Sequence, residues 1–220
     1  MKKLFFFLFV SLIFGLIVFY VYNRFSNTKP KIKSPISQKT LLTPSPSFQI
    51  EKAPTEALIG RILIMEGEVL WESRIASQPA KLKQPTALQQ GEKIITGNDG
   101  KITIRFAKDT DIVVKPQSSL NFAQTLPANL VLVQEKGTVE YSQDSDSLPL
   151  SVRVRHLLVR FDSGKMTIAA LEDNPYVTVS LEQGTAQAAY NDINYISQKI
   201  TVGSGETLIF DDDTRTSRTQ

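Results

Sequence analysis

The stretch Ile95–Val114, "ITGNDGKITIRFAKDTDIVV", decides the fold class of this chain. Within it Ile102, Ile104 and Phe106 alternate with polar residues, which is the period of a strand that buries one face. The preceding residues Gly97–Gly100 tolerate positive φ, as tight reversals require. We therefore expect strands joined by tight turns here, with the three apolar side chains in the core.

The same period of two continues over residues 57–212. Apolar pairs recur at every second position, and Gly, Asn and Asp interrupt them about every 8–12 residues, which is typical of an all-β sandwich, barrel or solenoid. We expect the chain to break at Glu135–Gly137, Asp162–Gly164, Asp173–Pro175 and Gln183–Gly184. No window offers a long amphipathic helix. The pattern predicts an all-β domain of many short strands over 57–212, followed by a flexible tail over 213–220.

A different composition marks the N-terminus. Leu4–Tyr22 is a run of 19 residues without a charge, and a helix of that length spans about 28 Å, close to the thickness of a bilayer core. The run ends without the small-residue site at which a signal peptide is cleaved. We therefore expect residues 1–22 to be a retained transmembrane anchor.

Residues 23–56 are rich in Pro, Ser and Lys and show no apolar period, which predicts a disordered linker. Residues 1–54 hold eight of the 25 basic side chains but one acid, Glu51. The remainder carries 17 basic and 21 acidic groups, a net charge of −4. Because a nucleic-acid-binding domain shows its positive charge on the folded part, we expect no nucleic acid partner.

Two features of the sequence favour opposite orientations of the anchor in the membrane. Basic residues after the helix outnumber Lys2 and Lys3 before it, and a plain charge count therefore places the domain in the cytoplasm. Long translocated domains obey that rule less strictly, and an anchor that begins at residue 4 is the usual start of an exported chain. We expect a single-pass membrane protein with residues 57–212 outside the cytoplasm.

Residues 57–212 resemble the FecR domain family. The resemblance rests on an opening G-x-V strand and on a spaced signature that continues to a terminal Ser. The matching positions are Gly67, Val69, Gly91, Ile94, Thr96, Gly97, Gly100, Ile104, Phe106, Asp109, Ile112, Val114, Pro116 and Ser119. The chain departs from the pattern directly after Asp109, because Thr110 stands where the family has Gly.

The resemblance implies a FecR-like β-sandwich or β-solenoid that lies beyond the membrane. Family regulators carry a cytoplasmic anti-sigma segment before the membrane helix, whereas only Met1–Lys3 precede the apolar run here. We therefore expect a non-enzymatic binding or scaffold module at the cell envelope, with an envelope protein or a glycan as its partner. The alternative is a regulator that relays a signal through its transmembrane helix.

Few residues suggest chemistry. The single histidine, His156, could act as a base, but without cysteine or a nucleophile motif we interpret it as an ordinary strand residue. Three adjacent acids, Asp211–Asp213, point to alternating sides of an extended chain and rarely converge on one cation, so we interpret them as a solvated strand end.

Three other features have structural interpretations. Asp109 and Asp111 suit turn capping. Trp71 shares a face with Val69, which favours core packing over sugar stacking. Gly203 and Gly205 precede no helix and do not form a phosphate loop. We expect no enzyme activity, no catalytic or metal-ligating residue and no cofactor, and the sequence leaves the oligomeric state open.

Overall fold

The computed structural model describes residues 56–76, 78–144 and 148–220. The predicted anchor and all but the last residue of the predicted linker lie outside this part of the chain. Within it no helix is long and apolar enough to cross a membrane. The described residues form strands and turns without any α-helix, which confirms the all-β prediction.

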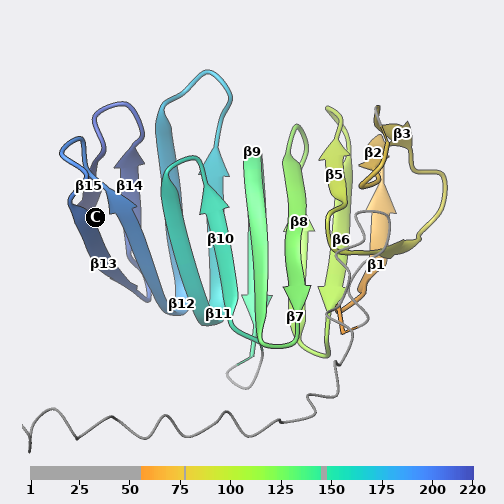
Figure 1. The fold of residues 1–220 in the computed structure, drawn as a ribbon, viewed down its shortest axis with the longest axis horizontal. Coiled ribbons are helices and arrows are strands. Elements are labelled where there is room, and N and C mark those ends of the chain that lie inside the picture. The colour runs from red at the N-terminus through yellow and green to blue at the C-terminus, as the bar shows by residue number, and fades with distance from the viewer. Residues whose placement is uncertain (1–55, 77, 145–147) are drawn as a thin grey trace, which may run out of the picture. The chain divides into compact units, whose positions relative to one another are not determined.

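Fifteen strands build this structure (Figure 1). They are β1 (Gly60–Glu66), β2 (Val69–Glu72), β3 (Ala80–Lys81), β4 (Ala87–Leu88), β5 (Lys93–Thr96), β6 (Lys101–Phe106), β7 (Thr110–Val114), β8 (Ser119–Leu126), β9 (Asn129–Gln143), β10 (Leu150–Val154), β11 (Leu157–Ala170), β12 (Tyr176–Asn191), β13 (Ser197–Gly203), β14 (Thr207–Asp211) and β15 (Thr216–Thr219).

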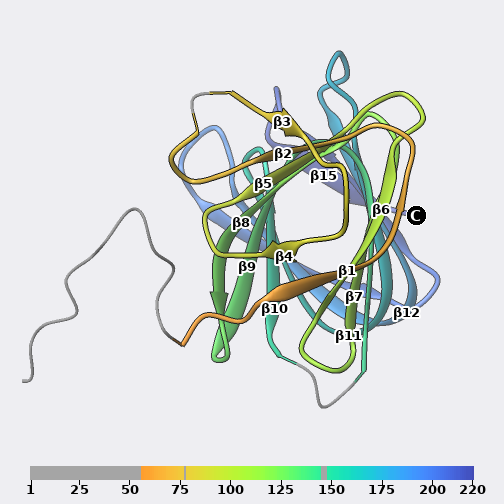
Figure 2. The ribbon, with the colours of Figure 1, turned by 90° about the vertical axis from the view of Figure 1, so that its right-hand side faces the viewer.

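Hydrogen bonds connect all the strands into one sheet that folds back on itself as two layers. The first layer runs β15–β14–β12–β11–β9–β7–β6–β1–β4, and it uses the N-terminal half of β12 and the C-terminal halves of β11 and β9. The second runs β13–β12–β11–β10–β9–β8–β5–β2–β3 and uses the other halves. Figure 2 shows how the strands surround the interior.

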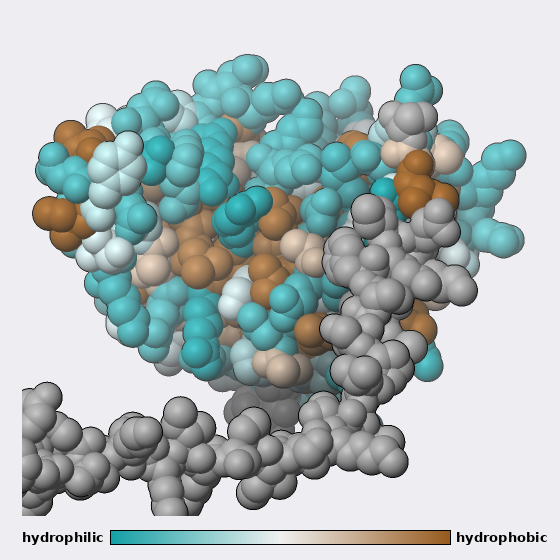
Figure 3. Space-filling model, viewed as in Figure 1, coloured by the Kyte–Doolittle hydropathy of each residue, from teal (hydrophilic) through white to brown (hydrophobic). Residues whose placement is uncertain are grey.

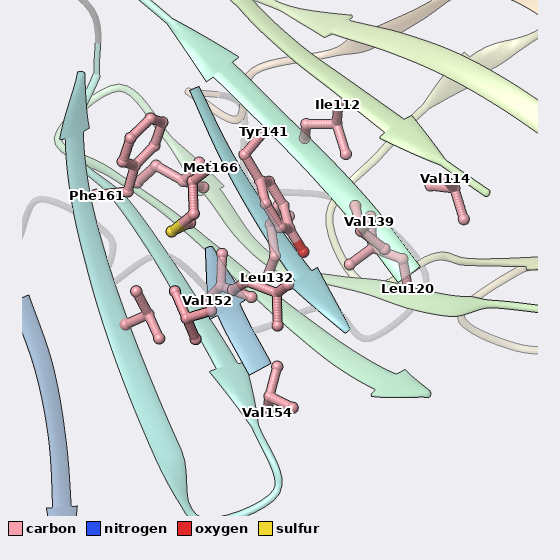
Figure 4. Close-up of a cluster of buried hydrophobic side chains, with 14 of the residues drawn as sticks. Ile112, Val114, Leu120, Leu132, Val139, Tyr141, Val152, Val154, Phe161 and Met166 are labelled. Atoms are coloured by element: carbon pink, nitrogen blue, oxygen red, sulfur yellow. The ribbon is translucent and has the colours of Figure 1, made fainter. Parts of the chain in front are cut away.

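Inward-facing side chains of both layers form one apolar core. Ile102, Ile104 and Phe106 are completely buried, as the opening stretch predicts. Tyr141 and Phe161 meet Met166 in the same core (Figure 4). The burial of β9 alternates on both sides of Glu135–Lys136 and changes phase there, so one strand contributes side chains to the core from both layers.

The predicted breaks at Gly137, Gly164 and Gly184 are bends inside the long strands β9, β11 and β12 and not chain reversals, so the prediction that a strand ends at each of them is wrong. All three glycines have positive φ, between 87° and 107°. Gly164 and Gly184 are register partners on β11 and β12. A Cβ on either would overlap a carbonyl oxygen of the neighbouring strand. Glycine is therefore needed where β11 and β12 bend together from one layer into the other.

Buried side chains supply hydrogen bonds at these bends. Gln134 donates to the carbonyls of Gly137 and Ile168 at 2.9 and 3.0 Å, and it accepts a bond from the Tyr141 hydroxyl at 3.0 Å. Gln143 donates to Phe161 and Asp162 beside the bend of β11. The two amides therefore supply donors to carbonyls beside the bends, in a part of the core where polar groups need hydrogen-bond partners.

Three further details differ from the sequence prediction. Gly97 and Gly100 do not have positive φ; a Cβ on Gly100 would instead overlap the Glu68 carbonyl oxygen. A bulge between Ile62 and Ile64 shifts the register of β1, and Ile64 is exposed as a result. The segment predicted as a flexible tail, 213–220, contains β15, which pairs with β14.

Candidate interaction site

The connection between β12 and β13 is a loop that holds its own shape. The Asp192 carboxylate accepts hydrogen bonds from the Asn194 and Ile196 N–H groups at 2.8 and 2.9 Å. The Asp192 N–H donates to the Ile196 carbonyl, and the Tyr195 N–H donates to the Asp192 carbonyl. Tyr195 has a φ of 62°, an uncommon conformation for a residue other than glycine. These bonds fix the loop without help from the rest of the domain.

The loop presents three large side chains to solvent, which we call the apolar tip: Ile193, Tyr195 and Ile196. They are 68%, 87% and 58% exposed. Figure 3 shows hydrophobic side chains gathered at this end of the molecule, around the β12–β13 connection. Single exposed apolar residues are ordinary, but three on one preorganised loop are typical of a contact surface.

The electrostatics of the loop keep Asp192 ionised. The Ile196 N–H, together with the Gln198 amide and the Asn194 N–H, holds the pKa of the Asp192 carboxyl below its ordinary value of 3.8, although partial burial opposes this. The loop is therefore held by a charged acceptor, which forms stronger hydrogen bonds than a neutral one.

Beside the tip, a set of side chains ties the two layers together. His156 donates its backbone N–H to Asp212, and its Nδ1 lies 2.9 Å from the same carboxylate oxygen. The Arg155 guanidinium donates to the carbonyls of Asn174 and Leu171, both at 2.6 Å. These contacts lie at the edge opposite the Gly164–Gly184 bends, so the layers are continuous at one edge and held by side chains at the other.

The structure thus brings together two features that the sequence treats separately. His156 lies in the β10–β11 turn and not within a strand, contrary to the sequence prediction, and it contacts the middle acid of the Asp211–Asp213 run. Asp211 instead accepts bonds from the Thr214 and Asp213 N–H groups, which lower the pKa of its carboxyl. Among the described residues no hydroxyl is hydrogen bonded to the imidazole, and no cluster of His, Asp and Glu there could hold a metal ion.

The remaining sequence candidates have structural roles. Asp111 lies on β7, where both carboxylate oxygens accept bonds from Arg105, so the turn-capping interpretation is wrong for this residue. Trp71 packs partly buried against the core, as predicted. Gly205 lies in the β13–β14 turn with a φ of 82°.

Sequence reasoning missed the apolar tip. The signal was present as "NDINYIS", in which large apolar residues stand inside a segment that begins with turn formers. A period-two interpretation assigns such residues to strands, and the loop that exposes them is recognisable only once β12 and β13 are paired.

No family model matches this chain, and no curated protein matches it. Two crystal structures of a proposed anti-sigma factor from Parabacteroides distasonis have a similar fold. Each is 12% identical to this chain with a TM-score of 0.51, and the match covers 58% of this chain and 58% of the neighbour. The chain therefore spans little more than half the length of these neighbours, and the likeness concerns the fold.

Proposed function

We propose that the chain is a membrane-tethered, extracytoplasmic FecR-like β domain that acts as a non-enzymatic binding or scaffold module at the cell envelope. The observation that carries this proposal is the apolar tip on its preorganised loop. The tethered and extracytoplasmic parts rest on the sequence of residues 1–56 and on the family resemblance, and the similar fold of the proposed anti-sigma factor supports the family.

The exposed tip makes energetic sense when a partner covers it. Burial of a large apolar side chain contributes about 1.5–3 kcal/mol. The Asp192 hydrogen bonds fix the loop before binding, so little conformational entropy is lost when the partner arrives. Rigid aromatic and aliphatic anchors of this kind dominate the energetics of many interfaces.

A photoreactive amino acid in place of Tyr195 tests the proposal in intact cells. We expect irradiation to attach the full chain to a protein, glycan or lipid at this position, seen as a defined adduct by mass spectrometry. Ile75 is the matched control because it is 70% exposed on a different loop. Equal adduct formation at the two positions, or none at Tyr195, would contradict a binding role for the tip.

The second candidate function is signal relay through the membrane helix. The observation in its favour is that the similar structures come from a proposed anti-sigma factor. Replacement of Leu4–Tyr22 by an unrelated apolar helix separates the two functions. A relay is abolished by this replacement, whereas a binding module keeps its adduct at Tyr195.

The location of the domain has its own test. Protease added to intact cells or spheroplasts should reach residues 56–220 if they lie outside the cytoplasm. Complete protection until the membrane is broken would reverse the topology and exclude an envelope partner.

A further inference from the structure

Four backbone N–H groups of the loop that carries the apolar tip are hydrogen bonded within the loop. The N–H groups of Asp192, Asn194, Tyr195 and Ile196 all donate to acceptors within the loop. A protein partner can supply missing hydrogen bonds, but the apolar boundary of a lipid bilayer cannot. A loop with this internal bonding can therefore enter the bilayer boundary without stranding these groups.

The side chains of the tip also suit that boundary. Ile193 and Ile196 are wholly apolar, whereas the ring of Tyr195 ends in a hydroxyl. Tyrosine is enriched at the membrane–water interface because its ring lies among the headgroups while its hydroxyl stays hydrated. An amphipathic tip of this kind dips into the interface without spanning the membrane.

The face of the second layer below the tip supplies complementary charge. Register places Arg153, Leu158, Ala189 and Lys199 in one row across β10, β11, β12 and β13. Alternation turns this row to solvent, and Leu158 in its middle is exposed. Two residues separate Ala189 from the first loop residue, Asp192, so the row lies directly beneath the tip.

The unpaired charges of this row are basic. Arg153 and Lys199 are exposed and have no ion pair among the described residues. The other two charged side chains of this part of the face, Arg160 and Asp162, pair with each other at 3.1 Å. On the neighbouring loops the Asp212 carboxylate is engaged by His156 and Glu172 pairs with Lys136, whereas Asp173 and Asp213 are exposed acids.

We propose that the apolar tip and the Arg153–Lys199 row together form a docking face for an anionic membrane surface. This inference rests on the proposed function and names the partner of the tip. The tip enters the headgroup boundary, and the two basic side chains approach lipid phosphates. The tethered domain then lies against the bilayer with its second layer facing the lipid.

Because the chain has no cysteine, one introduced thiol can be labelled at a single site. The test uses the full chain with Ile193→Cys and an environment-sensitive fluorophore, reconstituted in phosphatidylcholine vesicles with and without phosphatidylglycerol. We expect quenching by brominated lipid in the anionic vesicles and a blue-shifted emission. The matched control is Ile75→Cys, whose parent side chain has nearly the same exposure and which should stay unquenched.

Charge variants test the basic row. Each basic side chain near an anionic surface contributes about fivefold to binding. Arg153→Gln with Lys199→Gln should therefore shift the equilibrium away from the membrane by about 25-fold, as should added salt. The control, Lys165→Gln, removes an exposed lysine from the first layer and should leave quenching unchanged.

Two results would overturn the inference. One is a fluorophore at position 193 that brominated lipid does not quench in either vesicle. The other is quenching that is equal with and without anionic lipid and unaffected by the charge variants. A protein or glycan adduct at Tyr195 in cells together with an unquenched fluorophore would refute membrane docking while leaving the binding function in place.

Discussion

The paired bends of β11 and β12 lead to a sharp prediction about Gly184. Its φ is 94°, and a Cβ there would overlap the Ser163 carbonyl oxygen on the neighbouring strand. Gly205 is a natural control, because its φ of 82° is similar while a Cβ there would meet no atom within 4 Å. The two positions therefore share backbone strain and differ in steric contact.

The magnitudes follow from that difference. A residue with a Cβ in the left-handed region costs about 1–2 kcal/mol, which is the whole expected cost of Gly205→Ala. Gly184→Ala adds a displacement of β11 from β12. It also weakens the 2.9 Å bond from the Gly184 N–H to Ser204, and each lost bond costs about 1 kcal/mol. The displacement of packed backbone costs about 1–2 kcal/mol more, so we expect about 3–5 kcal/mol in total for Gly184→Ala.

Thermal unfolding of residues 56–220, followed by circular dichroism, measures both variants. At about 2–4 °C for each kcal/mol in a domain of this size, Gly184→Ala should lower the Tm by about 6–20 °C. Gly205→Ala should lower it by about 2–8 °C. Equal falls in Tm for the two variants would refute the close approach of the β11 and β12 backbones at Gly184. They would also remove the steric reason for glycine at this bend.

Three other predictions concern the core and the loop. Phe106→Ala empties a fully buried site and should cost about 3–5 kcal/mol by denaturant unfolding; an unchanged midpoint would mean that the side chain lies outside the core. Gln134→Leu leaves two carbonyls and the Tyr141 hydroxyl without their partner and should cost about 2–4 kcal/mol, whereas a neutral effect would show that the amide is dispensable at the bend. Because folding lowers the pKa of Asp192, the stability that its ionised carboxylate contributes is fully present above pH 3.8 and is lost as the pH falls through the pKa of the folded state. NMR should therefore show the Ile196 amide losing its hydrogen bond only when the pH falls below 3.8.

The sequence by itself determined the fold class and the identity of the core. Alternation along Ile102, Ile104 and Phe106 fixes which side chains share a face, because the period of a strand is a local property of the backbone. The same reasoning correctly placed the buried faces of Leu120 and Phe122. A strand needs no information about its partner to have two faces.

The tertiary structure alone decided what the glycines do and which loops meet. Gly137, Gly164 and Gly184 have the positive φ that a reversal also uses, so the residue type cannot distinguish a turn from a bend. The distinction depends on whether the next strand pairs beyond the glycine, which is a long-range property.

The candidate site was decided in the same way. His156 and Asp212 are 56 residues apart; β11 and β14 pair with opposite ends of β12, and the two residues meet because the strands bend at Gly164 and Gly184 and bring those ends together across the layers. Ile193, Tyr195 and Ile196 resemble strand residues in sequence, and they form an exposed tip because the pairing of β12 with β13 ends at Asn191 and Ser197. Local periodicity determines which way a side chain faces within a strand, but strand pairing determines where the strand ends and which loops lie side by side.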